Sequence, residues 1–457
     1  MIYFSSMAYK KPIDLIFGKS LNPLKYGFDL EVGNGKVIPE VKYWPRRGTE
    51  DSVQKTVKEF KEITIDLLER AVSLGISDLQ LETELNYKVT ENPKLAREII
   101  ETQINIMDKF YTKYGIRIAL RATIADIRGL RDLTFQNALQ TIFEAFEEVA
   151  DAGAHVLSIE SLGGKEVFDY SLLRGDIEGI IYSLGILAVR DMKRLWREIV
   201  NIARRHNSIA GGDTACGFAN TAMKLANGYL KPMLPHTYAA IIRALSASRS
   251  LVAYEMGARG PGKDCGYENV IIKAVTGYPM SMEGKSSAVA HSSLFGNIVA
   301  ATCDLWSNEQ VENIKLFGGT GPQVFLEILH YDVELMNIAL RMGRERILRQ
   351  MMVESDMYRD PQSLILSPSS AWRIGYKIVE NNDIYTRTLQ AGLEAISIIR
   401  ESLEKKLLKI DLKEKKWLNK LENKIRSLPE EENILIDRVE RKYRIKIPSF
   451  NPRNYEI

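Results

Sequence analysis

Short apolar runs alternate with longer amphipathic segments from Glu50 onward, and this alternation constrains the fold more than any other feature of the sequence. In the first unit, residues 51–74 carry apolar side chains at helical spacing, Gly75 suits the left-handed position that ends a helix, and a short apolar run follows at 78–81. The same pattern predicts later helices and strands at 93–114 and 116–120, 135–152 and 155–159, 180–205 and 208–210, and 237–248 and 251–254, with a further unit at 269–282.

Short buried strands that alternate with amphipathic helices form parallel βαβ units. Six or more such units over roughly 250 residues favour a closed (β/α)₈ TIM barrel. An open, doubly wound sheet is the alternative architecture. We therefore predict an α/β protein with an irregular N-terminal arm over residues 1–48, a TIM-barrel domain over 49–335, and a helical C-terminal extension over 336–457, where strand signals fade.

Composition narrows the class of protein. The chain is 45% hydrophobic and 26% charged, as in globular proteins, and its formal net charge of +3 is spread over interspersed residues of both signs. This balance argues against a nucleic-acid or anionic-membrane partner. The N-terminal residues lack the apolar core of a signal peptide, and no stretch reaches the roughly 20 apolar residues of a membrane span. Three cysteines are too few for a disulfide framework, so we expect a reducing, cytoplasmic setting.

Three residues that can bind a metal stand at the ends of predicted strands. In a barrel the reactive groups gather at the C-terminal ends of the strands, where the βα loops surround one mouth. Glu160, Cys216 and Cys265 each follow a predicted strand, one to two βα units apart. Two thiolates and a carboxylate form a plausible zinc ligand set with a fourth position open for substrate. The alternative is that the cysteines are small buried hydrophobes and that the carboxylate caps a helix.

Other candidate motifs are weaker. Cys303 falls inside the helical pattern 296–306, where a core position is expected. Gly257, Gly262 and Lys263 have P-loop spacing, but an acid, Asp264, stands where that loop needs Ser or Thr. The five histidines form no HExxH pair and no His-x-Cys pattern, which disfavours a thermolysin-like hydrolase.

At the same strand ends the sequence resembles the methanol:corrinoid methyltransferase family, whose zinc subunit activates methanol. The resembling stretches are 158–170 (SIESLGGKEVFDY), 212–216 (GDTAC), 220–223 (NTAM), 250–255 (SLVAYE), 260–269 (GPGKDCGYEN), 282–285 (MEGK), 306–309 (WSNE) and 358–362 (YRDPQ). The similarity runs nearly end to end, and the GPGKDCGYEN block is highly specific. Residues 121–131 match more loosely, with Ala122 and Ala125 at positions that differ from the family, so the choice of substrate is open.

The resemblance implies a TIM barrel with added helical regions and one zinc ion per chain, held by Glu160, Cys216 and Cys265. It further implies transfer of the methyl group of methanol to the reduced cobalt of a corrinoid protein. Zinc would act as a Lewis acid on the alcohol oxygen. The alternatives are another methyl donor, or a non-catalytic scaffold that docks the corrinoid subunit.

The partners and the proton donor complete these expectations. The chain has no Asp-x-His pattern of the kind that ligates corrinoid cobalt, so a separate protein must supply the corrinoid. We expect a homodimer within a hetero-oligomer. Asp213 and Glu84 are candidates to give a proton to the leaving oxygen, with hydrogen-bond acceptors or helix caps as their alternative roles.

Overall fold

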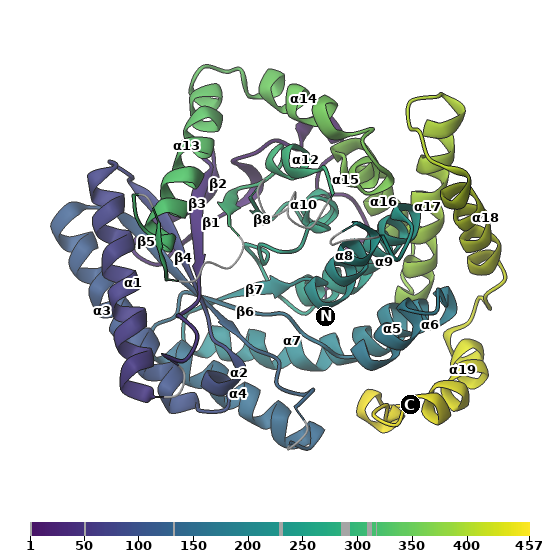
Figure 1. Ribbon diagram of the computed structural model, residues 1–457, viewed down its shortest axis with the longest axis horizontal. Coiled ribbons are helices and arrows are strands. Elements are labelled where there is room, and N and C mark those ends of the chain that lie inside the picture. Colours follow the sequence, from purple (N-terminus) through teal and green to yellow (C-terminus); the bar gives the residue numbers. More distant parts are fainter. Residues whose placement is uncertain are drawn as a thin grey trace.

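Seven parallel strands form the central sheet of the computed structural model (Figure 1). The structure describes residues 2–49, 52–130, 133–227, 232–284, 293–308, 313–316 and 318–457. The strands lie in the order β7-β6-β5-β4-β3-β9-β8. Their bounds are β3 Ile38–Tyr43, β4 Asp78–Glu84, β5 Arg117–Ile124, β6 Val156–Ile159, β7 Ile209–Asp213, β8 Ser281–Glu283 and β9 Leu305–Ser307.

Residues 259–264 occupy the eighth position and close the sheet. On one side the amide of Arg259 donates to the carbonyl of Ala210, in β7, at 2.9 Å. On the other side Gly262 forms a parallel bridge with Met280 beside β8, and the amide of Glu283 donates to the carbonyl of Asp264 at 2.9 Å. The predicted α/β barrel is confirmed.

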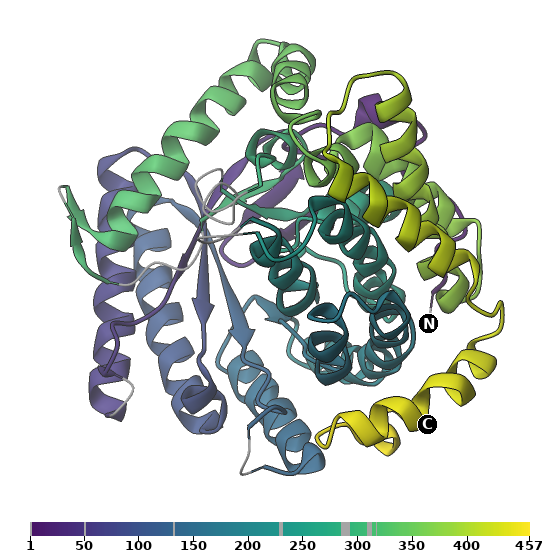
Figure 2. The ribbon, with the colours of Figure 1, turned by 45° about the vertical axis from the view of Figure 1, so that its right-hand side comes forward.

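Helices surround the barrel on its outer face (Figure 2). The main ones are α1 Val53–Ser73, α3 Pro93–Tyr114, α4 Phe135–Asp151, α7 Ala188–Arg205, α9 His236–Glu255, α10 Asn269–Thr276, α12 Gly296–Ala300 and α13 Gly321–Arg341. Their ends follow from local sequence. In α3 the Asn92 side chain caps the first turn, Pro93 takes a position that needs no amide hydrogen, and Gly115 ends the helix at φ 68°.

Shorter elements fill the loops at the C-terminal ends of the strands. They are α2 Tyr87–Thr90, α5 Lys165–Leu172, α6 Ile177–Tyr182, a π-helical turn at Ser183–Leu187, a second π-helical turn at Cys216–Asn220, α8 Thr221–Asn227, and the small hairpin of β10 Lys315–Leu316 and β11 Gly319–Thr320. At the opposite end, the hairpin β1 Lys19–Tyr26 and β2 Leu30–Asn34 covers the barrel, where Phe28 bridges to Ile118 at the start of β5.

The C-terminal extension is helical, as the sequence predicts. It consists of α14 Glu345–Asp356, α15 Pro361–Leu366, α16 Pro368–Val379, α17 Ile384–Glu404, α18 Leu412–Arg426, α19 Glu432–Lys446 and a 3₁₀ turn at Pro452–Tyr455. Helix α17 packs along α9, so the extension covers one side of the barrel. The boundary that the sequence predicts at 335/336 falls inside α13. None of the described helices combines the length and the apolar character needed to cross a membrane.

Three local predictions are wrong. Residues 251–254, expected as a strand, are the last turn of α9, whose side chains are buried on all sides and therefore show no helical period. Residues 38–43 lie in the sheet as β3, although we expected residues 1–48 to be irregular. The helix expected at 296–306 ends at Ala300, and Cys303 lies fully buried just before β9.

Candidate metal centre

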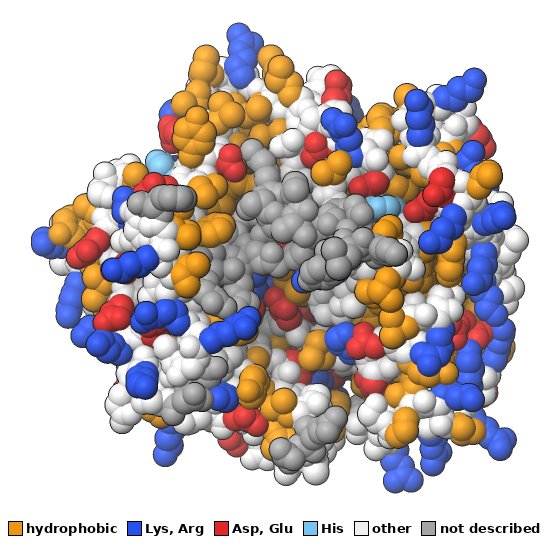
Figure 3. Space-filling view, viewed as in Figure 1, with side chains coloured by type: hydrophobic (Ala, Val, Ile, Leu, Met, Phe, Trp, Pro, Cys, Tyr) orange, Lys and Arg blue, Asp and Glu red, His pale blue; other side chains and the backbone are white. Residues whose placement is uncertain are grey.

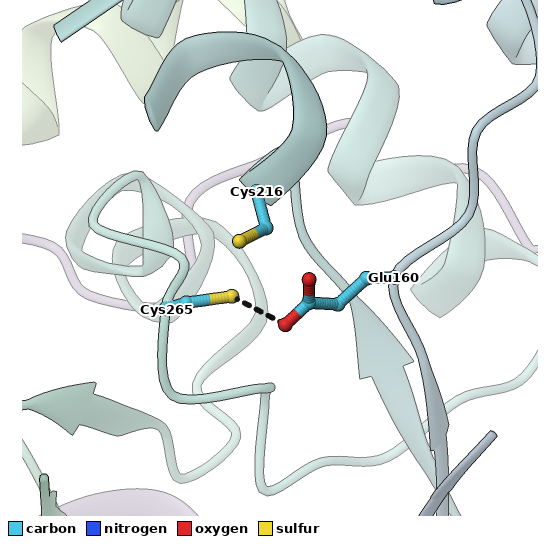
Figure 4. A group of neighbouring side chains, drawn as sticks. All are labelled: Glu160, Cys216 and Cys265. Atoms are coloured by element: carbon cyan, nitrogen blue, oxygen red, sulfur yellow. Dashed lines mark hydrogen bonds between the residues drawn. The ribbon is translucent and has the colours of Figure 1, made fainter. Parts of the chain in front are cut away.

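The three predicted ligands lie together at the C-terminal mouth of the barrel (Figure 4). Glu160 directly follows β6, Cys216 begins the π-helical turn after β7, and Cys265 directly follows the closing segment 259–264. Their ligand atoms all lie within 4.8 Å of one another. The Sγ of Cys265 donates a hydrogen bond to Oε1 of Glu160 at 3.1 Å.

Two glycines allow the ligand loops to approach this closely. Gly212, in β7, has φ 95°, and a Cβ there would lie 2.8 Å from the hydroxyl of Tyr254. Gly266 follows Cys265, and a Cβ there would lie 2.2 Å from the Cγ2 of Thr214. A side chain at either position would push one cysteine loop away from its neighbours.

Polar side chains from the Cys216 loop tie that loop to the Cys265 loop. The Nδ2 of Asn220 lies 3.5 Å from the Sγ of Cys216 and donates to the carbonyl of Cys265 at 3.1 Å. The hydroxyl of Thr214 lies 3.4 Å from the Sγ of Cys265. Arg243 in turn bonds to the amide oxygen of Asn220. Since these partners fix both sulfur atoms, the site is preformed on the thiol side.

A buried lysine supports the carboxylate side. The Nζ of Lys263 lies 3.3 Å from Oε1 of Glu160, 2.5 Å from Oε1 of Glu82 and 2.9 Å from Oδ1 of Asp264. Lys263 is fully buried, so these carboxylates compensate a charge that water cannot reach. Three carboxylates around its ammonium leave no role for Lys263 as a phosphate-binding P-loop lysine.

The charges decide the protonation of the ligands. Burial alone would raise the pKa of Glu160, but Lys263 and Lys42 outweigh it and hold that pKa below its usual value. Burial raises the pKa of the Cys265 thiol well above its usual value. For Cys216, the hydrogen bond with Cys265 lowers the pKa, but burial and the charge of Glu160 raise it more. Without a metal, the site therefore holds one carboxylate and two thiols.

The two candidate proton donors lie in different surroundings. Glu84 ends β4 and lines a cavity of about 380 Å³ together with Glu160. Asp213 is buried in the wall of the site, where it accepts from the amide of Ser161 at 3.3 Å and from the indole of Trp196 at 3.2 Å. Asp213 is not among the described residues that line this cavity. The structure thus brings Glu84, but not Asp213, to the space beside Glu160.

The donor set fits zinc. Two cysteine sulfurs and one carboxylate oxygen converge from three neighbouring loops, the set that zinc accepts when one coordination position stays open. Close CxxC pairs, which are typical of closed structural sites, are absent from the sequence. A bound metal ion would replace the hydrogen bond between Cys265 and Glu160 and would contact both groups.

Sequence reasoning missed the residues that support the ligands, Lys263, Asn220 and Thr214. All three lie within five residues of a predicted cysteine ligand, which is the signal that could have found them. The motif residues Arg131, Lys285 and Glu309 lie outside the described residues.

Comparison with known proteins shows the family to which the chain belongs. The family model of the methanol-cobalamin methyltransferase B subunit matches residues 1–456. A methanol–corrinoid protein co-methyltransferase from Methanosarcina barkeri is 46% identical over 455 residues, which span 99% of this chain and 98% of that protein. The crystal structure of the methanol:cobalamin methyltransferase complex MtaBC from the same organism matches with a TM-score of 0.97 at 45% identity, covering 100% of both chains. The chain belongs to the methanol-cobalamin methyltransferase B subunit family.

Proposed function

We propose that this protein transfers the methyl group of methanol to the reduced cobalt of a corrinoid carried by a separate protein. The observation that carries the proposal is the cluster of Glu160, Cys216 and Cys265 at the barrel mouth, where Glu160 lines a cavity of about 380 Å³. Full-length similarity to a methanol–corrinoid protein co-methyltransferase supports the same reaction.

We further propose that the cluster holds one zinc ion per chain. When bound, zinc would supply Lewis acidity toward the alcohol oxygen, which counters the poor leaving-group character of hydroxide. The protein supplies the ligands in a fixed arrangement, because Asn220 and Thr214 hold the sulfur atoms and Lys263 holds Glu160.

The cavity beside Glu160 suits a small alcohol. Apolar side chains of Trp44, Leu85, Ile124 and Leu162 form part of its lining. Its volume of about 380 Å³ exceeds what one methanol fills, since a liquid water molecule takes roughly 30 Å³. The remaining space leaves room for a second reactant to approach the methyl carbon. Figure 3 shows a hollow with acidic side chains near the middle of the face viewed.

Glu84 is our candidate for the group that gives a proton to the leaving oxygen. Burial raises its pKa, and Glu160 and Asp264 raise it further, against the opposing effect of Lys42 and Lys263. A carboxyl group that keeps its proton to higher pH than usual can donate it as the carbon–oxygen bond breaks, so that hydroxide departs as water. The two electrons for the new cobalt–carbon bond come from the reduced cobalt.

Asp213 then takes a positioning role. Its two hydrogen bonds, to the Ser161 amide and to the Trp196 indole, fix the first residue after Glu160. Arg249 lies 3.6 Å from the same carboxylate and donates to the carbonyl of Ser161 at 2.9 Å. We therefore propose that Asp213 orients the Glu160 loop and leaves proton transfer to Glu84.

We also propose that the chain forms a homodimer through α13. An apolar stripe on this helix follows a heptad spacing and is solvent-exposed. It comprises Ile328, Tyr331, Leu335, Ile338 and Met342, with exposed fractions of 49%, 82%, 58%, 39% and 67%. Figure 3 shows apolar side chains gathered over this region at the top of the view.

A second copy of the chain fits this α13 stripe. Heptad spacing of apolar residues is the pattern by which helices pair side by side. The charged residues on one flank of the stripe already make ion pairs within the chain: Glu327 with Arg70 at 2.7 Å, and Glu334 with Arg341 at 2.8 Å. In an antiparallel, two-fold pair the apolar residues of one copy would cover those of the other, and this contact, rather than the flanking charges, would hold the pair together.

A methyl-transfer assay tests the proposed reaction. The zinc-loaded chain, mixed with a reconstituted and reduced corrinoid protein, should form methyl-cobalt from methanol. The purified chain alone should be colourless and inactive. Turnover of a methylamine or a methoxylated aromatic in place of methanol would overturn the substrate, and zinc-free chain that docks the corrinoid protein without any turnover would favour a scaffold.

A further inference from the structure

The loop that follows the metal ligand Glu160 is held by side chains from three distant elements. The amide of Ser161 donates to Asp213 at 3.3 Å, and the amide of Leu162 donates to Asp126 at 2.7 Å. The amide of Gly164 donates to the hydroxyl of Tyr455 at 2.9 Å. Backbone amides that are fixed in this way leave the loop few alternative conformations.

The third partner, Tyr455, belongs to the C-terminal 3₁₀ turn, 291 positions away in the chain. Figure 2 shows the C-terminal helix running along the outside of the barrel, so that the last residues reach the first turn of α4. There the ring of Tyr455 packs edge-on against Phe135, with the centroids 6.2 Å apart, and stacks against Phe450, with the centroids also 6.2 Å apart. Only 3% of Tyr455 is exposed.

The hydroxyl of Tyr455 bonds at once to the end of the Glu160 loop, residues 160–164, and to the first turn of α5. It accepts from the amide of Gly164 and donates to Oε1 of Glu166 at 2.7 Å. Gly164 is the N-cap of α5, has φ 82°, and carries no side chain that could cap the helix. The tyrosine hydroxyl therefore takes over part of the capping that this loop cannot provide for itself.

We propose that Tyr455 is a positioning residue for the metal ligand Glu160, so that the C-terminal end of the chain completes the metal centre. The inference rests on the proposed zinc site. The ring and the hydroxyl have separable roles, because the ring packs against Phe135 and Phe450 while the hydroxyl makes the hydrogen bonds to Gly164 and Glu166. A Tyr455→Phe variant keeps the ring packing and removes the two hydrogen bonds.

The test compares Tyr455→Phe with Tyr443→Phe in the full-length protein. Tyr443 is also a buried tyrosine of the extension, and its hydroxyl donates to Asp176 at 2.9 Å, away from the Glu160 loop. Two quantities are measured: hydrogen exchange of a peptide spanning residues 158–168 without metal, and the zinc dissociation constant by competition with a chelator.

We expect Tyr455→Phe to speed exchange in that peptide and to weaken zinc binding about fivefold to tenfold, the effect of roughly one hydrogen bond. Tyr443→Phe should leave both quantities at the wild-type values. Faster exchange with unchanged zinc affinity would overturn the proposal, because the hydroxyl would then hold the loop without holding the ligand. Unchanged exchange would overturn it as well. A wild-type protein that binds no zinc would instead overturn the proposed metal site, whatever the exchange shows.

Discussion

The Sγ of Cys265 lies 3.1 Å from Oε1 of Glu160, although 105 positions separate the two residues in the sequence. This contact joins the residue after β6 to the residue after the closing segment of the barrel. When the proton of such a buried thiol leaves, a metal cation can take its place and be held by both the sulfur and the carboxylate.

We expect about one zinc ion per chain, because the clustered Glu160, Cys216 and Cys265 would supply three ligands of a single open tetrahedral site. Cys216→Ala and Cys265→Ala should each lose most of the metal during dialysis, as measured by elemental analysis. Cys303→Ala is the matched control, since Cys303 lies in the core and should leave the zinc content unchanged. Full zinc content in the Cys216, Cys265 double variant would refute the ligand assignment.

Zinc binding should release about two protons near neutral pH, because zinc takes cysteine as thiolate. The pKa values of both cysteines are raised in the folded protein, so both thiols are protonated there, whereas the lowered pKa of Glu160 keeps it ionised. Zinc affinity should accordingly rise with pH. Calorimetry in buffers of different ionisation enthalpy measures the proton count, and a count near zero would show that the thiols are already ionised.

Glu160→Gln should lower the rate of methyl transfer by about tenfold or more, which corresponds to roughly 1.4 kcal/mol at the transition state. The substitution keeps the size of the side chain but removes one negative charge from the metal ligands. The measurement is methyl-cobalt formation from methanol by zinc-loaded protein at several pH values. Glu101→Gln, on the exposed face of α3, serves as the control. Equal rates for wild type and Glu160→Gln at every pH would remove Glu160 from the metal.

Glu84→Gln should lower the rate by about 100-fold or more, the usual contribution of a general acid. Because the pKa of Glu84 is raised, the carboxyl stays protonated to higher pH than usual, and the wild-type rate should fall as the pH rises through that value. The groups that set this pKa are Lys42, Glu160, Lys263 and Asp264. The variant should lose this descending limb, and exposed Glu91→Gln should retain it. An unaltered pH profile in Glu84→Gln would assign the proton to another donor.

Replacing Tyr331 and Leu335 by Glu should convert the proposed dimer into monomers, since charges would then be buried along the α13 stripe. The mass in solution, measured by light scattering, reports the change. Ile434→Glu, at a 52% exposed apolar position on α19, is the control and should stay dimeric. A wild-type chain that is monomeric at micromolar concentration would refute the dimer itself.

The order of strands and helices could be read from the sequence wherever the barrel obeys simple periodicity. It could not be read at β3, because Glu40 and Lys42 face the barrel interior and make ion pairs with other strands, so the strand is not an apolar run. The prediction of secondary structure also failed at the end of α9, because this helix is buried on all sides and its sequence therefore shows no helical period.

The proposed metal ligands could be predicted from the sequence because the C-terminal ends of the strands converge in any barrel. Their supports depend on tertiary contacts that no local pattern encodes. Lys263 gains its role only where Glu82 and Glu160 approach it from two other strands. Tyr455 likewise gains its contact with the Glu160 loop only because the C-terminal extension returns to the mouth of the barrel.

Residues 259–264 lie between β7 and β8, and Cys265 comes next in the chain. A metal ion held by Cys265, Cys216 and Glu160 would cross-link β6, β7 and the closing segment 259–264, at the place where the sheet closes into a barrel. Occupancy of the site and closure of the barrel are then thermodynamically linked. Distortion of the contacts between the closing segment and its neighbours β7 and β8 therefore lowers metal affinity. Loss of the metal destabilises those contacts by the same free energy.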